Sequence, residues 1–172
     1  MIIRKLRDRD FDGMRQLYDY AHAEVKEDPA YGDWVKLKKP SRKDRLVQFG
    51  TWLKEIKRGN MLFYVAEDKG RIIGFCFIKK IVIPDSELSH VGELGVRVAN
   101  EFRGNGIGRK LAEHALRMSK NKFEIVDVEI LGINKVSKHL FKTMGFKTWG
   151  IAPGFVKRKH NYIDIEHMCI KM

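Results

Sequence analysis

A glycine-rich turn late in the chain constrains the fold more than any other segment. Residues 94–108 read LGVRVANEFRGNGIG, an alternating apolar run followed by a polar turn and three glycines spaced two apart. The alternation is typical of a strand, and a helical pattern starts after the turn. Because glycine lets a ligand approach the backbone and a helix start exposes N–H groups under positive potential, this turn is suited to binding phosphate. Arg103 and Arg109 add full positive charges.

Two common phosphate-binding folds do not match the turn. The chain has no G-x-x-x-x-G-K-[ST] motif, which argues against a P-loop. A dinucleotide fold places its glycines directly after the first strand of a parallel βαβ unit. Here the glycines come late and follow segments whose pattern indicates antiparallel strands, so a nucleotide fold of either kind is disfavoured.

The hydrophobic pattern predicts one α+β domain over residues 1–172, with the order β-α-α-β-β-β-α-β-α-β-β. A capping box at Ser41 and Asp44 opens the second helix, residues 68–70 form a hairpin turn, and Gly145 ends the last helix. Strands are predicted over residues 2–6, 61–67, 71–83, 89–98, 123–131, 146–151 and 162–170. The apolar helix stripes are Phe11, Met14, Leu17, Tyr18 and Ala21; Leu46, Phe49, Leu53 and Ile56; Ile107, Leu111, Ala115 and Met118; and Val136, Leu140 and Met144.

The composition limits the classes of partner. No apolar run approaches the ~20 residues of a membrane span, and the first residues lack a signal-peptide pattern, so we expect a cytoplasmic protein without a membrane partner. Cys76 and Cys169 lie in apolar runs and are expected to be buried free thiols. The histidines lack metal-ligand spacing, so no metal site is expected. The formal net charge of +12 favours an anionic partner: a polyphosphate cofactor, an acidic substrate or nucleic acid.

Two blocks of the chain resemble the GNAT superfamily of N-acetyltransferases. Residues 103–108 (RGNGIG) match every fixed position of its Arg/Gln-x-x-Gly-x-Gly/Ala signature. Asn134, Ser137 and residues 145–146 (GF) are similar to its second block, Asn-x-x-Ala…Gly-Phe. The order of the predicted elements extends the resemblance over nearly the whole chain. It implies a mixed, mostly antiparallel central sheet with helices on both faces and a splayed pair of strands for CoA.

The resemblance also implies acetyl-CoA as cosubstrate. Residues 96–98 would pair with the pantetheine arm, the N–H groups of residues 104–109 would hold the pyrophosphate, and Asn134 would contact the cofactor from the neighbouring strand end. Gly95 suits a β-bulge on the strand predicted over residues 89–98. The implied cofactor-binding residues are Val96, Arg97, Val98, Arg103, Gly104, Asn105, Gly106, Ile107, Gly108, Arg109, Asn134 and Ser137.

Acetyl transfer to an ammonium substrate needs a general base that releases the neutral amine. The resemblance implies two candidate catalytic carboxylates, Glu93 just before the splayed strand segment and Glu129 five residues before Asn134. Our hypothesis is that Glu93 acts as the base. Many family members place a tyrosine seven residues after the asparagine as an acid, but this chain has Phe141 there, which has no proton to donate. Either solvent or another residue then protonates the CoA thiolate, and Tyr162 is the nearest tyrosine by family topology.

The sequence leaves the acceptor open. The resemblance places it over the C-terminal hairpin and the first two helices with their loop, where Tyr31, Asp33 and Trp34 precede several lysines. We expect a primary amine of a protein N-terminus, a lysine, a polyamine or a small amino compound. The alternative is a non-catalytic CoA-sensing or nucleic-acid-binding regulatory protein on the same fold. Nucleic acid is disfavoured because the basic residues are spread along the chain, and a homodimer is one assembly that the sequence leaves open.

Overall fold

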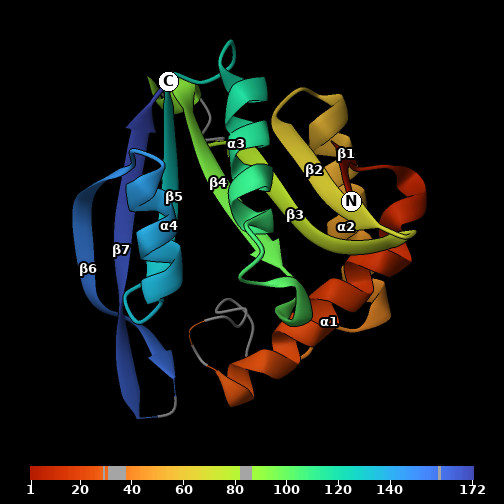
Figure 1. The fold of residues 1–172 in the computed structure, drawn as a ribbon, viewed down its shortest axis with the longest axis horizontal. Helices are drawn as coiled ribbons and strands as arrows, with labels where there is room; N and C mark the ends of the chain where they lie inside the picture. The colour runs from red at the N-terminus through yellow and green to blue at the C-terminus, as the bar shows by residue number, and fades with distance from the viewer. Residues whose placement is uncertain (29, 31–37, 82–86, 159) are drawn as a thin grey trace.

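The structure, a computed structural model, describes residues 1–28, 30, 38–81, 87–158 and 160–172. Within these residues, seven strands form one sheet in the order β1-β2-β3-β4-β5-β7-β6 (Figure 1). Neighbouring strands are antiparallel except β4 and β5, which run parallel. The strands are β1 (Ile2–Lys5), β2 (Met61–Asp68), β3 (Arg71–Lys80), β4 (Val91–Val98), β5 (Ile125–Leu131), β6 (Lys147–Arg158) and β7 (Asn161–Lys171); the helices are α1 (Phe11–Glu27), α2 (Arg42–Lys57), α3 (Ile107–Ser119) and α4 (Lys135–Thr143).

The helices cover both faces of the sheet because successive strand residues point to opposite sides. Phe63 of β2 belongs to the same buried cluster as Leu17 of α1 and Phe49 of α2. The next residue, Tyr64, belongs to the cluster that contains Leu111 of α3. In Figure 1, α3 and α4 lie in front of the sheet and α2 lies behind it. The predicted α+β architecture with helices on both faces is therefore confirmed.

The sheet opens between β4 and β5. These strands pair only where residues 91–93 face residues 125–127. Beyond that point, β4 stays paired with β3 up to Val98, and β5 stays paired with β7 up to Leu131. Since each strand follows its outer neighbour, a gap separates them, and the splayed pair that the resemblance implied is confirmed.

Several local predictions are confirmed. The Ser41 side chain accepts a hydrogen bond from the Asp44 N–H, and the Asp44 carboxylate accepts one from the Ser41 N–H at 2.9 Å. The turn between β2 and β3 contains Lys69 and Gly70 at φ of 48° and 79°. Gly145, at φ 92°, follows α4 in the left-handed conformation that commonly ends helices.

The predicted core stripes are wrong at three positions, because Leu46, Met118 and Val136 are exposed. In α2, Arg45 is buried in place of Leu46, with 4% of its surface exposed. Its guanidinium stacks over the Tyr18 ring, 4.9 Å from the ring centroid. A long side chain with an aromatic partner can thus occupy a position where the pattern predicts an aliphatic one.

The predicted end of strand β6 is also wrong, because the strand runs seven residues beyond Ile151, to Arg158. Pro153 and Gly154 lie within a register irregularity between Ala152 and Val156. Because β6 is the edge strand, a proline there removes no ladder hydrogen bond that the sheet needs.

The predicted β-bulge at Gly95 is wrong, because the β3–β4 register is continuous from Lys80↔Gly92 to Gly74↔Val98. Gly95 has a different reason to lack a side chain. It faces Phe77 across the ladder, and a Cβ at Gly95 would lie 2.4 Å from a carbon of the Phe77 ring. The ring therefore lies over the β4 backbone.

Three further expectations differ in detail from the structure. Strand β4 begins at Val91 because residues 87–90 form a 3₁₀ turn. Strand β3 ends at Lys80, and residues 82–83 of the predicted strand lie outside the described residues. Cys76 is buried, as expected, but Cys169 is partly exposed; both thiols are free.

No helix among the described residues is long and apolar enough to span a bilayer.

Candidate active site

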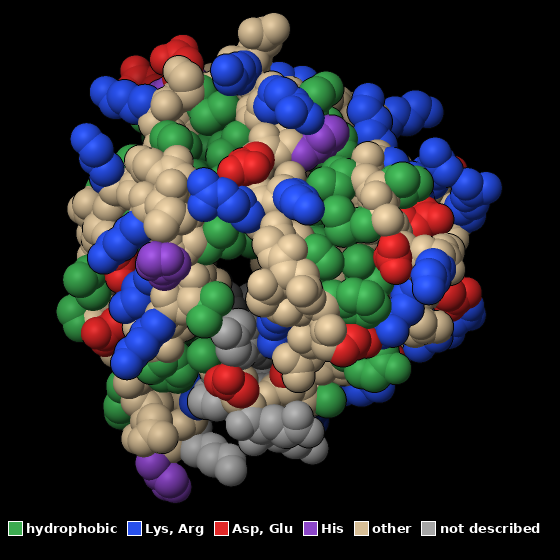
Figure 2. Space-filling model, in the orientation of Figure 1, with side chains coloured by type: hydrophobic (Ala, Val, Ile, Leu, Met, Phe, Trp, Pro, Cys, Tyr) green, Lys and Arg blue, Asp and Glu red, His purple; other side chains and the backbone are tan. Residues whose placement is uncertain are grey.

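A cleft of about 1370 Å³ runs through the gap between β4 and β5. On one face of the sheet it is lined by the start of α3 and by α4, and on the other face by α2 and the end of β3. Figure 2 shows the surface hollowed near the middle of the face that carries α3 and α4. A site for two substrates, one entering from each face of the sheet, fits this shape.

Backbone polar groups of β4 point into the gap. Ala99 N–H donates to Ile73 on the β3 side, and Val91 accepts there from Ile81. Because the direction of backbone groups alternates along a strand, the even-numbered residues of β4 direct their N–H and C=O groups towards β5. At Val96 and Val98 strand β5 has already diverged, so the N–H and C=O of Val96 and the N–H of Val98 can pair with an extended ligand, while the Val98 carbonyl accepts from Arg103.

The glycine-rich turn leads directly into α3. Gly104 and Gly106 have φ of 76° and 71°, in the left-handed region that glycine adopts without strain. A Cβ at either position would meet nothing within 4 Å, so the turn leaves an open surface. The first bond within α3 is Lys110 N–H to the carbonyl of Gly106. The N–H groups of Ile107, Gly108 and Arg109 thus have no partner in the preceding turn, which makes the helix start an anion site.

The arginines beside the turn are engaged with protein groups. Arg103 bonds Glu24 of α1 at 2.8 Å and the Val98 carbonyl at 3.0 Å. Arg109 bonds Glu113 at 2.8 Å and the Thr143 hydroxyl at 3.0 Å. The structure therefore gives Arg103 a role in fastening α1 to the turn, and backbone N–H groups are the main donors that the turn offers.

The second block of the resemblance lies at the start of α4. The Asn134 Oδ1 accepts a hydrogen bond from the Ser137 N–H at 2.9 Å, which caps the helix. The Asn134 Nδ2 donates to the Ala30 carbonyl at 2.9 Å. Both Asn134 and Ser137 line the cleft. Asn134 therefore joins the cofactor side of the cleft to the segment after α1.

Both candidate bases flank the point where β4 and β5 separate. Glu93 faces Asp127 in the last paired position, and Glu129 follows on the same face of β5. The Glu93 carboxylate pairs with Lys79 at 3.1 Å. Although 37% of the Glu129 side chain is exposed, partial desolvation by the surrounding protein raises its pKa, the negative charge of Glu93 raises it further, and His167, 4.0 Å away, opposes the shift. A carboxylate with a raised pKa is the stronger base.

Other predicted residues lie apart from this point. Tyr162 is 65% exposed, packs beside Lys157 on the β6–β7 hairpin, and is not among the described residues that line the cleft. Phe141 is buried edge-on against Phe146, with centroids 5.0 Å apart. The loop residues at positions 31, 33 and 34 lie outside the described residues.

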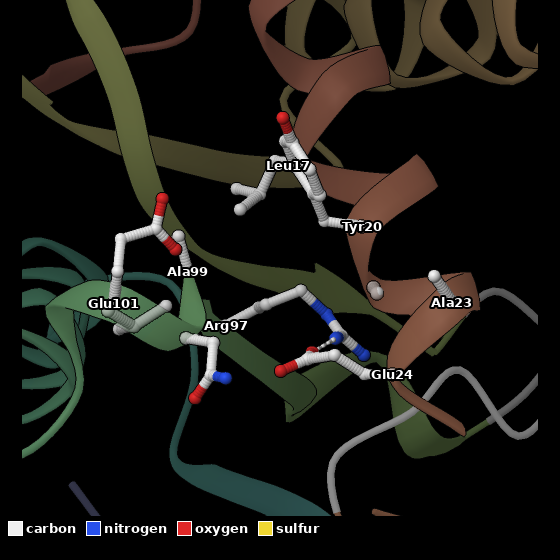
Figure 3. Close-up of a pocket in the computed structure, with 10 residues that line it drawn as sticks. Leu17, Tyr20, Ala23, Glu24, Arg97, Ala99 and Glu101 are labelled. Atoms are coloured by element: carbon white, nitrogen blue, oxygen red, sulfur yellow. Dashed lines mark ion pairs between the residues drawn. The ribbon is translucent and has the colours of Figure 1, made fainter. Parts of the chain in front are cut away.

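A smaller cavity of about 250 Å³ lies between α1 and the end of β4 (Figure 3). Glu24 points across it to Arg97, whose Nη1 lies 3.7 Å from the carboxylate. The Arg97 side chain is thus directed to α1, and its backbone, at an odd-numbered position, is directed to β3. Of residues 96–98, Val96 and Val98 direct backbone groups into the gap, whereas Arg97 lines the cleft with its backbone groups directed to β3 and its side chain to Glu24.

Sequence reasoning missed the side chains that line the acceptor side of the cleft. Trp52 of α2 and Phe77 of β3 line it together with Tyr18, which was expected in the core. Lys79 and His167, which flank the candidate bases, were also missed. No motif marks these residues, and only the strand register, which pairs Lys79 with Glu93 and His167 with Glu129, places them.

Comparison with known proteins decides the family. The sequence matches the Acetyltransferase (GNAT) family over residues 14–146. The chain belongs to this family. YwnH of Bacillus subtilis (strain 168), provisionally assigned as a phosphinothricin acetyltransferase, is 28% identical to this GNAT chain over 104 residues, which are 60% of the chain and 64% of YwnH. The 5-NmdU N-acetyltransferase of Pseudomonas phage PaMx11 is 30% identical over 92 residues, or 53% and 61% of the two proteins. The match thus spans less than two thirds of these relatives' own lengths.

Solved structures support the GNAT fold over the whole chain. The ribosomal-protein-alanine N-acetyltransferase from Brucella melitensis superposes with a TM-score of 0.84 at 22% identity, covering 100% of both chains. A phosphinothricin acetyltransferase from Sinorhizobium meliloti, solved in complex with AcCoA, gives a TM-score of 0.82 at 19% identity and covers 99% of this chain and 88% of its own. At these identities, the likeness establishes the fold alone.

Proposed function

We propose that this GNAT chain is an N-acetyltransferase that moves an acetyl group from acetyl-CoA to a primary amine. The observation that carries the proposal is the gap between β4 and β5. Anion-binding N–H groups lie on one side of it, and two carboxylates flank the point where it begins. The cofactor then occupies the face with α3 and α4, and the amine approaches from the face with α1 and α2.

The residues present fit CoA. The N–H groups of residues 107–109 and the open glycine positions suit a pyrophosphate. The N–H and C=O of Val96 and the N–H of Val98 are available to the amides of pantetheine. The bound cofactor supplies a thioester that an amine can attack. Family relatives named for different acceptors, phosphinothricin and 5-NmdU, match the chain about equally well, so they do not select its acceptor.

Glu129 fits the role of general base better than Glu93, which our sequence hypothesis favoured. The Glu93 carboxylate is already engaged in an ion pair with the Lys79 ammonium, 3.1 Å away. Burial and the charge of Glu93 instead favour the protonated form of Glu129, so this carboxyl holds a proton more tightly. In the proposed reaction Glu129 takes the proton from the ammonium, directly or through water, and Glu93 tunes its basicity.

Solvent in the cleft protonates the departing thiolate in this proposal. Phe141 stands where many family members carry a tyrosine, and Tyr162 is not among the described residues that line the cleft. A thiol has a pKa near 8.5, so its thiolate needs little help to leave near neutral pH. The chain can therefore function without a dedicated general acid.

The test combines binding with turnover. Acetyl-CoA should raise the melting temperature, because a ligand that binds only the native state stabilises it. Incubation with an amine library should release free CoA thiol and yield acetylated amine by mass spectrometry. Binding without release from any amine would favour the CoA-sensing alternative, and no stabilisation by acetyl-CoA would refute the proposal.

A further inference from the structure

The acceptor side of the cleft has an aromatic wall, made by Tyr18, Trp52, Phe75 and Phe77. Its ring centroids are separated by 5.4 Å between Tyr18 and Trp52, 5.2 Å between Tyr18 and Phe75, and 6.2 Å between Phe75 and Phe77. Phe75 is buried, but the other three rings are partly exposed. The wall is therefore a continuous π-surface that faces the cleft as well as the core.

Gly95 brings this wall next to the reacting centre. The Phe77 ring lies so close over Gly95 that a Cβ there would meet it at 2.4 Å. Gly95 and Glu93 are two residues apart on the same face of β4, about 6.6 Å along the strand. A flat group resting against Phe77 thus lies within the length of a short alkyl chain of the candidate bases.

Two charged side chains beside this wall, among the described residues, are already paired with protein groups. Lys79 pairs with Glu93, and Glu55 accepts hydrogen bonds from Arg58 at 2.9 Å and from Asn60 at 2.8 Å. With these two charges paired, the described part of the wall offers a ligand mainly aromatic surface. A neutral ring gains from offset or edge contacts with that surface.

Resting on the proposed function, we propose that the acceptor is an arylalkylamine: a primary amine joined by a short alkyl arm to an aromatic or heteroaromatic ring. The ring packs against Phe77 and Trp52. The arm carries the amine to the carboxylates of Glu93 and Glu129. Specificity then resides in residues that neither bind CoA nor transfer protons.

The experiment measures kcat/KM by thiol release for 2-phenylethylamine, n-hexylamine, spermidine and glutamate. The wild type should prefer 2-phenylethylamine by about tenfold or more, since aromatic contacts contribute on the order of one power of ten in affinity. Phe77→Leu and Trp52→Leu should each remove most of that preference while leaving KM for acetyl-CoA unchanged. Phe155→Leu is the matched control, because Phe155 is 68% exposed on the edge strand β6.

Each outcome separates this inference from the proposed function. A preference for spermidine or glutamate, or an unchanged preference in both leucine variants, would overturn the inference and leave the acetyltransferase proposal standing. Binding of acetyl-CoA without turnover of 2-phenylethylamine would overturn it as well. Failure of the wild type to bind acetyl-CoA would refute the proposed function itself. Stabilisation of each variant by acetyl-CoA verifies that it is folded.

Discussion

Replacement of Glu129 by glutamine should remove general-base catalysis and leave the fold intact. A positioned base contributes about 10²- to 10⁴-fold, so kcat/KM should fall by that factor, or by about 3–5 kcal/mol of transition-state stabilisation at 1.36 kcal/mol per tenfold. Glutamine has nearly the same size and keeps a carbonyl oxygen. Binding of acetyl-CoA should be unchanged, because Glu129 lies on the acceptor side of the gap.

The pH dependence of activity gives a second test of Glu129 as the base. Burial and the Glu93 charge raise the pKa of Glu129, so activity should rise with pH through that raised value as the carboxylate forms. Glu93→Gln removes the repelling charge and should move this acidic limb to lower pH without abolishing it. Glu129→Gln should abolish the limb.

Stability separates loss of chemistry from loss of structure. A carboxyl whose pKa is raised by folding stabilises the protein below its unfolded pKa, and this contribution is lost as pH rises through the folded value. At neutral pH the ionised Glu129 therefore works against folding, and Glu129→Gln should keep or raise the melting temperature. Glu87→Gln, on an exposed 3₁₀ turn, is the control. An acidic limb that persists in Glu129→Gln but disappears in Glu93→Gln would refute the assignment of the base.

Three further predictions test the fold around the site. Gly106→Ala should lower the free energy of unfolding by about 1–2 kcal/mol, because the φ of 71° at this position strains any residue with a Cβ. Titration calorimetry should also show weaker acetyl-CoA binding. Unchanged affinity would argue against this turn as the phosphate site. Phe141→Ala should cost about 3–5 kcal/mol in denaturant unfolding because the ring is fully buried, whereas Phe155→Ala should change stability little. Burial alone would raise the pKa of Asp10, but hydrogen bonds from Arg4 and a backbone N–H lower it. Its contribution is therefore present above the unfolded pKa and lost as pH falls through the folded one, and thermal melts of Asp10→Asn should lose this acid dependence.

The cofactor side of the site could be predicted from the sequence because its chemistry depends on the backbone. Glycines at 104 and 106 are required by positive φ, and a glycine-rich helix start has a recognisable spacing. The gap between β4 and β5 followed from the family resemblance. Even here, the structure assigns Arg103 and Arg97 to Glu24, a contact between residues far apart in sequence that no local pattern encodes.

The acceptor side could not be predicted because tertiary register builds it. No sequence pattern marks Phe77 or Trp52 as site residues, and only the strand pairing sets Phe77 over Gly95. Gly95 itself was assigned to a bulge, because a glycine in a strand signals either a bulge or a close approach and the sequence does not distinguish them. The raised pKa of Glu129 likewise depends on burial and on the nearby charge of Glu93, across the β4–β5 ladder.

Amide hydrogen exchange with and without acetyl-CoA tests the central claim most directly. The account predicts slower exchange in residues 94–98, whose even-numbered N–H groups point into the gap, and in residues 104–110 at the start of α3. Residues 147–158 of the edge strand β6 should be unaffected. Protection confined to other segments, or no protection at saturating acetyl-CoA, would contradict the placement of the cofactor between β4 and β5.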